Sequence, residues 1–332
     1  MKVDQETESL REREKTVIES NIQWTAAILI ILISALFVFP PEYLLAKQIS
    51  KYAVHWMFLS LFLGIVFMFM NLEKLLYTAF ICSGLLAFLL LYSYNSSFSH
   101  AEETSRDVFS LSFVNPSLST AYEDSNQAKI LSLNADILLL EEVSPEYISL
   151  LNALKSKYPY HAILSRADAF GKAVFSKFKL ESVDTLQLQN RPILLTSMGI
   201  SARKTINVVV VNEMPPVTMN DFRRINVFLD DLSRILQHIE NPVILGANLN
   251  LVLSSREVRE FRVKSSLIPS RRDNQDGRSG NDFLSLFNTP KNEIFFTNEI
   301  ECVEFEEIND NNQKPIGITG KYQFRRPNNT HQ

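Results

Sequence analysis

Two adjacent carboxylates, Glu141 and Glu142, follow an apolar run at residues 137–140. Carboxylate oxygens are the ligands that Mg²⁺ and other hard cations prefer in proteins. A carboxylate after a buried strand is more often solvated than metal-bound, so both interpretations stay open for this segment taken alone. The chain has no Gly-Lys-Ser/Thr phosphate loop, zinc-spaced Cys/His set or Gly-x-Ser-x-Gly elbow, and its 9 glycines argue against a dinucleotide-binding loop.

The elements that must position these carboxylates can be read from hydrophobic patterning. Ser144 and Pro145 predict the start of one helix, with serine as the N-cap and proline in the first turn, and a 3.6-residue period predicts a second helix over 220–239. Strands and helices in mixed order indicate a layered α/β domain. Short runs rich in branched apolar residues predict strands at 108–114, 137–140, 173–175, 206–211, 243–245 and 294–297.

Three apolar stretches near the N-terminus, 24–40, 52–72 and 75–94, contain no Asp, Glu, Lys or Arg. Each is long enough to cross a hydrocarbon core roughly 30 Å thick, so we expect three transmembrane helices. More than twenty residues, most of them polar, precede the first stretch, which argues against a cleaved signal peptide. The expected organisation is an N-terminal tail at 1–23, these helices, a linker at 95–106, one α/β domain at 107–326 and a tail at 327–332.

Basic residues near the membrane predict the orientation. Four of them, Lys2, Arg11, Arg13 and Lys15, precede the first apolar stretch, and two follow it in the next loop. The positive-inside rule then predicts a cytoplasmic N-terminus, and three spans place the α/β domain outside the cytoplasm. The cysteines give no evidence on this orientation. Cys82 lies in the third apolar stretch and Cys302 is alone in the α/β domain, so no disulfide can form within that domain.

Charge argues against one class of partner. The formal net charge of -4 indicates no general basic surface for phosphate neutralisation, so a nucleic-acid partner is not expected. A local basic cluster is interpreted as a solvated face. It comprises Arg256, Arg259, Arg262, Lys264, Arg271 and Arg272.

The order of segments over 108–324 resembles the endonuclease/exonuclease/phosphatase superfamily, the DNase I-like proteins. Residues 135–143 look like its metal-site strand, which usually ends in Gln-Glu-Val, and 242–250 look like its strand ending in Gly-Asp-Phe-Asn. Residues 208–216 look like the strand that delivers a histidine before a proline pair, and 158–160 and 171–176 look like two further landmarks. The resemblance implies a four-layer α/β sandwich. Members with three N-terminal spans are familiar in bacteria, which implies an integral protein of the bacterial inner membrane.

The resemblance also implies a chemistry. Family members hydrolyse phosphate esters with a carboxylate-bound Mg²⁺ or Mn²⁺ that stabilises charge, and with an Asp–His pair that helps to activate water. Glu142 matches the metal-binding glutamate, and Glu293 lies near an aspartate position, so both are candidate metal ligands. Asn212 stands in place of a phosphate-contacting histidine, Asn248 in place of an aspartate, and Asn250 matches the family asparagine.

Other family residues are missing. The Ser-Asp-His motif before the last strand is replaced by Ile-Gly-Ile-Thr-Gly-Lys-Tyr at 316–322. The first-strand asparagine is ambiguous, because Asn115 is nearby but the alignment of Ser112 and Phe113 puts Val114 in that place. The five histidines, His55, His100, His161, His238 and His331, do not fill the gap.

Three hypotheses follow. The first is a membrane-tethered pseudoenzyme that binds a protein partner, a lipid head group or a phosphorylated ligand. The second is a divergent phosphodiesterase in which Glu142, Glu293 and the asparagines Asn248 and Asn250 hold a metal. The third is a membrane-complex subunit whose spans carry the function and whose α/β domain is a scaffold.

Overall fold

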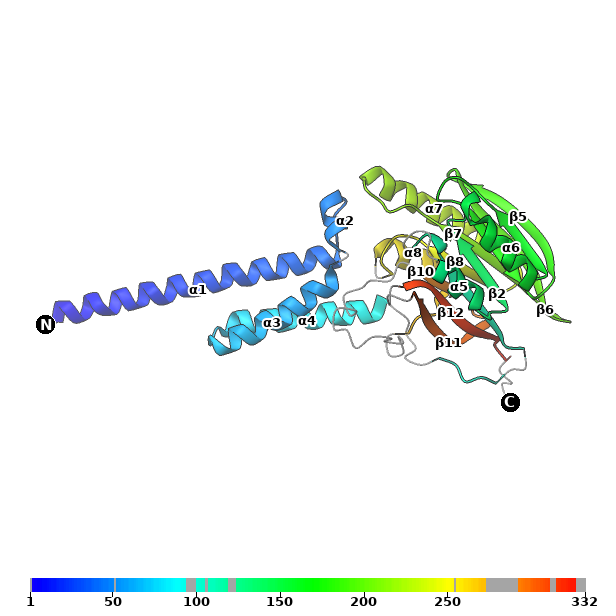
Figure 1. Ribbon diagram of the computed structural model, residues 1–332. Helices are drawn as coiled ribbons and strands as arrows, with labels where there is room; N and C mark the ends of the chain where they lie inside the picture. The colour runs from blue at the N-terminus through cyan, green and yellow to red at the C-terminus, as the bar shows by residue number, and fades with distance from the viewer. Residues whose placement is uncertain are drawn as a thin grey trace. The chain divides into compact units, whose positions relative to one another are not determined.

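The computed structural model describes residues 2–50, 52–93, 100–104, 107–118, 124–253, 255–272, 292–310 and 315–326. The chain forms two compact units, Met1–Tyr92 and Ser93–Gln332, and each is described by itself. The first is helical, and the second contains the strands (Figure 1).

The N-terminal unit contains four helices, α1 (Lys2–Val38), α2 (Leu44–Ser50), α3 (Ala53–Phe69) and α4 (Glu73–Ser93). Among the described residues, Ser20–Val38 and Glu73–Leu90 are long and apolar enough to cross a membrane. The helices α2 and α3 are long and apolar enough only when taken together, and the chain bends by 70° between them. The described residues therefore contain two candidate spans, or three if this pair is one broken span. The expected middle span, 52–72, contains all of α3, and the bend lies before α3.

The C-terminal unit is built on two six-stranded sheets. The first sheet has the order β11-β12-β1-β2-β4-β3, and the second has the order β5-β6-β7-β8-β10-β9. In the first sheet the strands are β1 (Phe109–Val114), β2 (Ile137–Glu141), β3 (Tyr160–Leu164), β4 (Lys172–Ser176), β11 (Ile300–Asn309) and β12 (Pro315–Phe324). In the second sheet they are β5 (Leu180–Leu188), β6 (Arg191–Ser201), β7 (Lys204–Asn212), β8 (Val243–Asn248), β9 (Ile268–Pro269) and β10 (Asn292–Phe296).

The two sheets pack face to face through an apolar core. Phe113 and Leu139 from the first sheet share this core with Ile244 and Ile294 from the second. The sheets are in close contact at Gly246, where an added Cβ would lie 2.8 Å from Leu139 Cδ1. Side chains alternate between the two faces of a strand, so every second residue of these strands points into the layer between the sheets.

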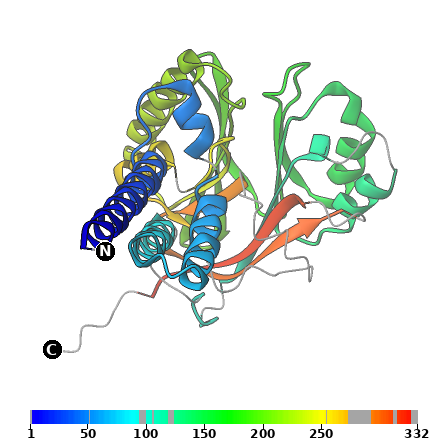
Figure 2. The same cartoon turned by 90° about the vertical axis from the view of Figure 1, so that its left-hand side faces the viewer.

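Helices cover the outer faces. Figure 2 shows α7 (Met219–Gln237) and α8 (Arg256–Ser265) on one outer side of the strands, and α5 (Asp124–Ser132) and α6 (Ile148–Lys157) on the other. The α6 leucines pack on the outer face of the first sheet, and Phe261 of α8 meets Phe295 of β10 at 6.2 Å between ring centroids. The expected layered α/β architecture is confirmed.

Two expected helix starts are shifted. Ser144 and Pro145 begin a short 3-10 turn, Pro145–Tyr147, in which the Ser144 side chain makes no capping hydrogen bond, and α6 begins only at Ile148. The second helix begins one residue earlier than expected, because Thr218 and Asp221 form a reciprocal capping box. That box satisfies backbone N–H groups which the helix itself cannot pair.

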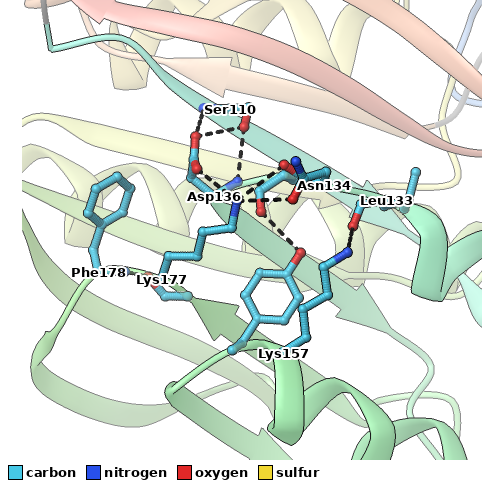
Figure 3. Close-up of polar contacts among 10 residues, drawn as sticks. Ser110, Leu133, Asn134, Asp136, Lys157, Lys177 and Phe178 are labelled. Atoms are coloured by element: carbon cyan, nitrogen blue, oxygen red, sulfur yellow. Dashed lines mark hydrogen bonds and ion pairs between the residues drawn. The ribbon is translucent and has the colours of Figure 1, made fainter.

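A polar latch at the start of β2 ties three strands together (Figure 3). Asp136 Oδ2 accepts hydrogen bonds from Ser110 N at 2.9 Å and Ser110 Oγ at 2.8 Å, and Asp136 Oδ1 lies 3.1 Å from Lys177 Nζ. Burial raises the pKa of Asp136, but the bonds from Ser110 and Lys177 outweigh it, so the pKa is lowered overall. The latch joins these strands at the edge of the sheet opposite to the edge that carries Glu141 and Glu142.

Candidate functional site

The candidate site lies where the central strands of both sheets end. The parallel pairs β1–β2 and β7–β8 bring Val114 beside Leu140 and Asn212 beside Asn248. Ligand sites in α/β folds lie at such carboxyl ends of strands. We call the polar residues there the strand-end cluster, which comprises Asn115, Glu141, Glu142, Lys172, Asn212, Glu213, Asn248 and Asn250.

Strand alternation aims most of this cluster into the layer between the sheets. Glu141 lies two residues after Leu139, and Asn248 two after Gly246, and both Leu139 and Gly246 face that layer. The Asn248 Nδ2 amide donates to Glu141 Oε1 at 3.0 Å. This hydrogen bond therefore connects the two sheets at the site.

Glu142 leaves the strand in an unusual conformation. Its φ is 54°, in the left-handed region that costs a residue with a side chain of order 1–3 kcal/mol. Its carboxylate contacts Ser117 Oγ, which also lies 2.8 Å from Asn115 Oδ1. A hydroxyl has one proton, so it can donate to only one of the two at a time. The left-handed backbone turns the chain at Glu142, and the contact with Ser117 orients its carboxylate at the strand end.

Gly171 makes this turn possible. An added Cβ at Gly171 would lie 1.8 Å from the carbonyl oxygen of Val143, which no side chain permits. The backbone N–H of Val143 donates to the Gly171 carbonyl at 3.1 Å, so the two segments are in direct contact. The close approach sets the next residue, Lys172, directly opposite Glu141 in the β2–β4 pair.

Glu141 is completely buried. Burial raises its pKa to about 8, and the negative charge of Glu142 adds to the rise. The hydrogen bond from Asn248 and the positive charge of Lys172 act in the opposite direction. Burial therefore outweighs the favourable contacts of Glu141 with the amide and the cation.

Lys172 is a buried cation at the same strand end. It has no exposed surface, and its Nζ donates to the Phe170 carbonyl at 3.1 Å. Burial lowers its pKa to about 8, while the charges of Glu141, Asp168 and Glu213 favour the ammonium form. Lysine is seldom fully buried, and here the Phe170 carbonyl accepts one N–H of the ammonium group while the nearby carboxylates favour its charged form.

The second sheet contributes a second charged pair. Arg191 Nε lies 3.3 Å from Glu213 Oε1, and the Arg191 guanidinium stacks 4.1 Å from the Phe170 ring centroid. Asn212 Nδ2 donates to the Ala169 carbonyl at 2.6 Å, and Asn250 Nδ2 donates to the Glu213 carbonyl at 2.6 Å. All three predicted asparagines, counting Asn248, therefore use an amide donor within the protein.

Three buried acceptor oxygens at the site have no hydrogen-bond partner among the described residues: Glu141 Oε2, Asn212 Oδ1 and Glu213 Oε1. Buried polar atoms in folded proteins are nearly always paired. Asn115 Nδ2 is a buried donor without a described partner in the same cluster, and Glu213 Oε1 has Arg191 Nε at 3.3 Å, so the unpaired atoms include acceptors and a donor.

Glu293 is in a different place from the other predicted residues. It pairs with Ala247 across β8 and β10, one residue out of phase with Asn248, so it points to the opposite face of the second sheet. Its Oε1 accepts from the backbone N–H groups of Ser270 at 3.1 Å and Ile294 at 3.0 Å, and Arg271 Nε lies 3.9 Å from Oε2. Burial raises its pKa to about 7. Glu142, Asn212, Asn248 and Asn250 are thus brought together without Glu293.

The donor set does not fit the divalent metal centre that the resemblance implies. Among the described residues, no three His, Cys, Asp or Glu side chains are grouped to hold a metal ion. The two adjacent carboxylates differ, because Glu142 is partly exposed while Glu141 is buried, bonded to Asn248 and faced by Lys172. Mg²⁺ binding at Glu142 stays a prediction, to be tested by titration.

The histidines have other surroundings. The His161 ring lies 5.9 Å from the Phe175 ring, His238 Nδ1 lies 2.7 Å from the Arg234 carbonyl oxygen, and His100 Nε2 lies 3.2 Å from that of Ser270. His55 is in α3, and His331 lies outside the described residues.

Sequence reasoning missed Lys172, Arg191 and Glu213. A signal for Lys172 was present, because a lysine begins an otherwise apolar strand directly after a glycine. Arg191 and Glu213 carried no comparable signal, since their pairing depends on the β6–β7 register.

Comparison with known proteins identifies the architecture. The model of the Endonuclease/Exonuclease/phosphatase family matches residues 119–311, more than half of the chain. A search of curated protein sequences finds no match.

Solved structures give the same result for the fold. An endonuclease/exonuclease/phosphatase from Beutenbergia cavernae DSM 12333 is similar with a TM-score of 0.53 at 13% identity, over 66% of this chain and 72% of that one. The human Nocturnin catalytic domain, solved with a bound sulfate anion, is similar with a TM-score of 0.50 at 13% identity, over 69% and 97%. At these identities the likeness shows the fold alone, and it confirms the expected DNase I-like sandwich.

Proposed function

This chain belongs to the endonuclease/exonuclease/phosphatase family, and we propose that it is a membrane-tethered member whose family hydrolysis is impaired and whose strand ends serve as a binding or regulatory site. The observation that carries the proposal is the state of two asparagines. Asn212 and Asn248 stand where the resemblance implies histidine and aspartate, and both amide nitrogens already donate within the protein, to Ala169 and Glu141.

The chemistry of amides explains the impairment. Hydrolysis of a phosphate ester by this family needs a group that takes a proton from water and one that stabilises charge on the phosphoryl oxygens. An asparagine side chain neither gains nor loses a proton near neutral pH. Of the two adjacent carboxyls, Glu141 is buried, which leaves Glu142 as the accessible one.

A divergent metal-dependent phosphodiesterase is the second candidate. The observation that favours it is the set of buried acceptor oxygens without a described partner, on Glu141, Asn212 and Glu213. Together with the Glu142 carboxylate, these oxygens are the type of ligand that a cation site needs. On this alternative Mg²⁺ or Mn²⁺ binds at Glu142 and activates water without histidine.

Membrane attachment is part of the proposal. Two helices are long and apolar enough to span a bilayer, and the basic residues before Ser20 favour a cytoplasmic N-terminus. We place the protein in a bacterial inner membrane with its α/β domain outside the cytoplasm, which needs the bent α2–α3 pair to be a third span. Alkaline phosphatase fused at the C-terminus would then be active, and an inactive fusion would contradict that orientation.

The ligand that we propose is a phosphorylated small molecule or a lipid head group, since the chain attaches the domain to a membrane and the family handles phosphate esters. Its affinity is testable by thermal-shift titration with inorganic phosphate and glycerol phosphate. A protein partner remains an alternative occupant.

The experiment that tests the proposal is hydrolysis of bis-p-nitrophenyl phosphate by the full-length protein in detergent, with Mg²⁺ or Mn²⁺. We expect the wild-type protein to hydrolyse this substrate no faster than Glu142→Ala in the same assay. A rate that Glu142→Ala abolishes and the exposed control Glu146→Ala retains would establish the phosphodiesterase and overturn the proposal.

A further inference from the structure

We propose that Lys172 is an internal countercation: its ammonium group supplies, from within the chain, the positive charge that the buried carboxyl groups at the strand ends require, in place of a divalent ion. The inference rests on the proposed loss of family metal chemistry and explains how the fold keeps this site without it.

The first support is the direct pairing of Lys172 with Glu141. The two residues are opposite each other in the antiparallel β2–β4 ladder, so their side chains leave the same face at neighbouring positions. Leu139 and Val174, two residues away on the same strands, lie in the core between the sheets. Both charged side chains therefore enter that layer, and neither has exposed surface.

The second support is the balance of donors and acceptors. An ammonium group has three N–H donors, and one of them is used by the Phe170 carbonyl at 3.1 Å. The buried oxygens without a described partner belong to Glu141, Glu213 and Asn212. The charges of Glu141 and Glu213 both act on Lys172. Lys172 therefore acts on these carboxyl groups as a neighbouring buried charge, not through a hydrogen bond to either of them.

The third support is the rigidity of the position. Gly171, which no residue with a Cβ could replace, presses against Val143 and sets the start of β4. The Phe170 ring has Lys172 Nζ at 5.8 Å and the Arg191 guanidinium at 4.1 Å from its centroid, and Arg191 also pairs with Glu213. The two cations and the ring form one fixed assembly with the buried carboxyl groups.

A tethered cation has two consequences. It removes the large cost of burying carboxyl charge without a partner, so the folded domain does not depend on added metal. It also repels a second cation at short range, because two positive charges in a poorly solvated layer interact strongly. The same lysine therefore stabilises the site and opposes divalent-ion binding beside Glu142.

The test is a double-mutant cycle in the full-length protein in detergent, using Glu141→Gln, Lys172→Met and both together, with exposed Lys155→Met as control. We expect Lys172→Met to lower the Tm by on the order of 10 °C, and Glu141→Gln in the same chain to recover a substantial part of that loss. The control should leave the Tm unchanged. If Lys172→Met fails to fold, a folded double variant gives the same support.

Two results would overturn the inference. One is a cycle in which the Tm changes caused by Glu141→Gln and Lys172→Met simply add. A Lys172→Met protein as stable as wild type would count in the same way, because in either case Lys172 would balance no buried charge. The other is Mn²⁺ binding to wild type with an affinity that Lys172→Met leaves unchanged, where we expect at least a roughly tenfold gain in the variant. The Tm values and the Mn²⁺ affinity are both measured without turnover. Glu142-dependent hydrolysis would therefore overturn the proposed function, while the double-mutant cycle would still test the role of Lys172 separately.

Discussion

Asn248 on β8 donates its side-chain amide to Glu141 on β2 over 3.0 Å, and this bond joins the two sheets where the family site would lie. In the resemblance Asn248 replaces an aspartate. A carboxylate there would face buried Glu141, and two carboxyl groups at this distance cannot both be ionised without strong repulsion. Asparagine at position 248 is therefore compatible with a buried glutamate at position 141, whereas the aspartate of the family would repel it.

Loss of this bond should destabilise the domain. Asn248→Ala leaves Glu141 Oε1 without its donor, so we expect the free energy of unfolding to fall by about 1–3 kcal/mol. Urea unfolding followed by circular dichroism measures this, with exposed Asn152→Ala as the matched control. A change below about 0.5 kcal/mol, the usual scatter of surface substitutions, would show that the bond contributes little.

The restored double variant Asn212→His with Asn248→Asp should remain inactive on bis-p-nitrophenyl phosphate. These changes return two groups, but the Ser-Asp-His motif that the resemblance implies is absent from 316–322. The double variant must be shown to fold, because Asn248→Asp adds a carboxylate beside Glu141. Turnover by the double variant would refute this explanation of which groups are missing.

Glu293 should make stability depend on pH. Burial raises its pKa from 4.5 to about 7, so its contribution is full below pH 4.5 and is lost as the pH rises through 7. The stability of wild type relative to Glu293→Gln should therefore fall over that interval by up to about 3 kcal/mol, at about 1.4 kcal/mol per pKa unit. Chemical unfolding at several pH values tests this, with exposed Glu240→Gln as control. A pH-independent difference would contradict the assignment.

The Asp136 latch should depend on serine more than on lysine (Figure 3). Ser110 Oγ lies 2.8 Å from the carboxylate and is part-buried, whereas Lys177 and Asp136 side chains are 35% and 30% exposed, which screens their charges. We expect Ser110→Ala to cost about 1 kcal/mol of unfolding free energy and Lys177→Met less than about 0.5 kcal/mol. The reverse order in thermal unfolding would contradict this.

Much of the fold could be predicted because local pattern and burial agree. The apolar runs at 137–140 and 243–245 are buried on both faces, and they became the centres of β2 and β8. The strands β3, β5, β6, β9, β11 and β12 were not predicted; β5 is exposed over most of its length, and polar residues interrupt β11 and β12. The start of α6 was misplaced because Pro145 favours a 3-10 turn as well as an α-helix.

The site was predictable in part for a physical reason. Asn212 and Asn248 end two buried strands that the resemblance identified, and the parallel pairing of β7 and β8 brings these strand ends side by side. Glu293 could not be placed, because a shift of one residue in the β8–β10 register moves a side chain to the other face. The role of Lys172 depends on carboxyl groups from two other strands, and such a combination appears only in the folded chain.

Metal titration is the most direct test of the central claim that the family metal chemistry is lost. Mn²⁺ is titrated by calorimetry into the full-length protein in detergent, beside Glu142→Ala. We expect both proteins to give the same weak heats, with no saturable site up to about 1 mM. A one-site isotherm in wild type that Glu142→Ala abolishes would contradict the claim and establish Glu142 as a metal ligand.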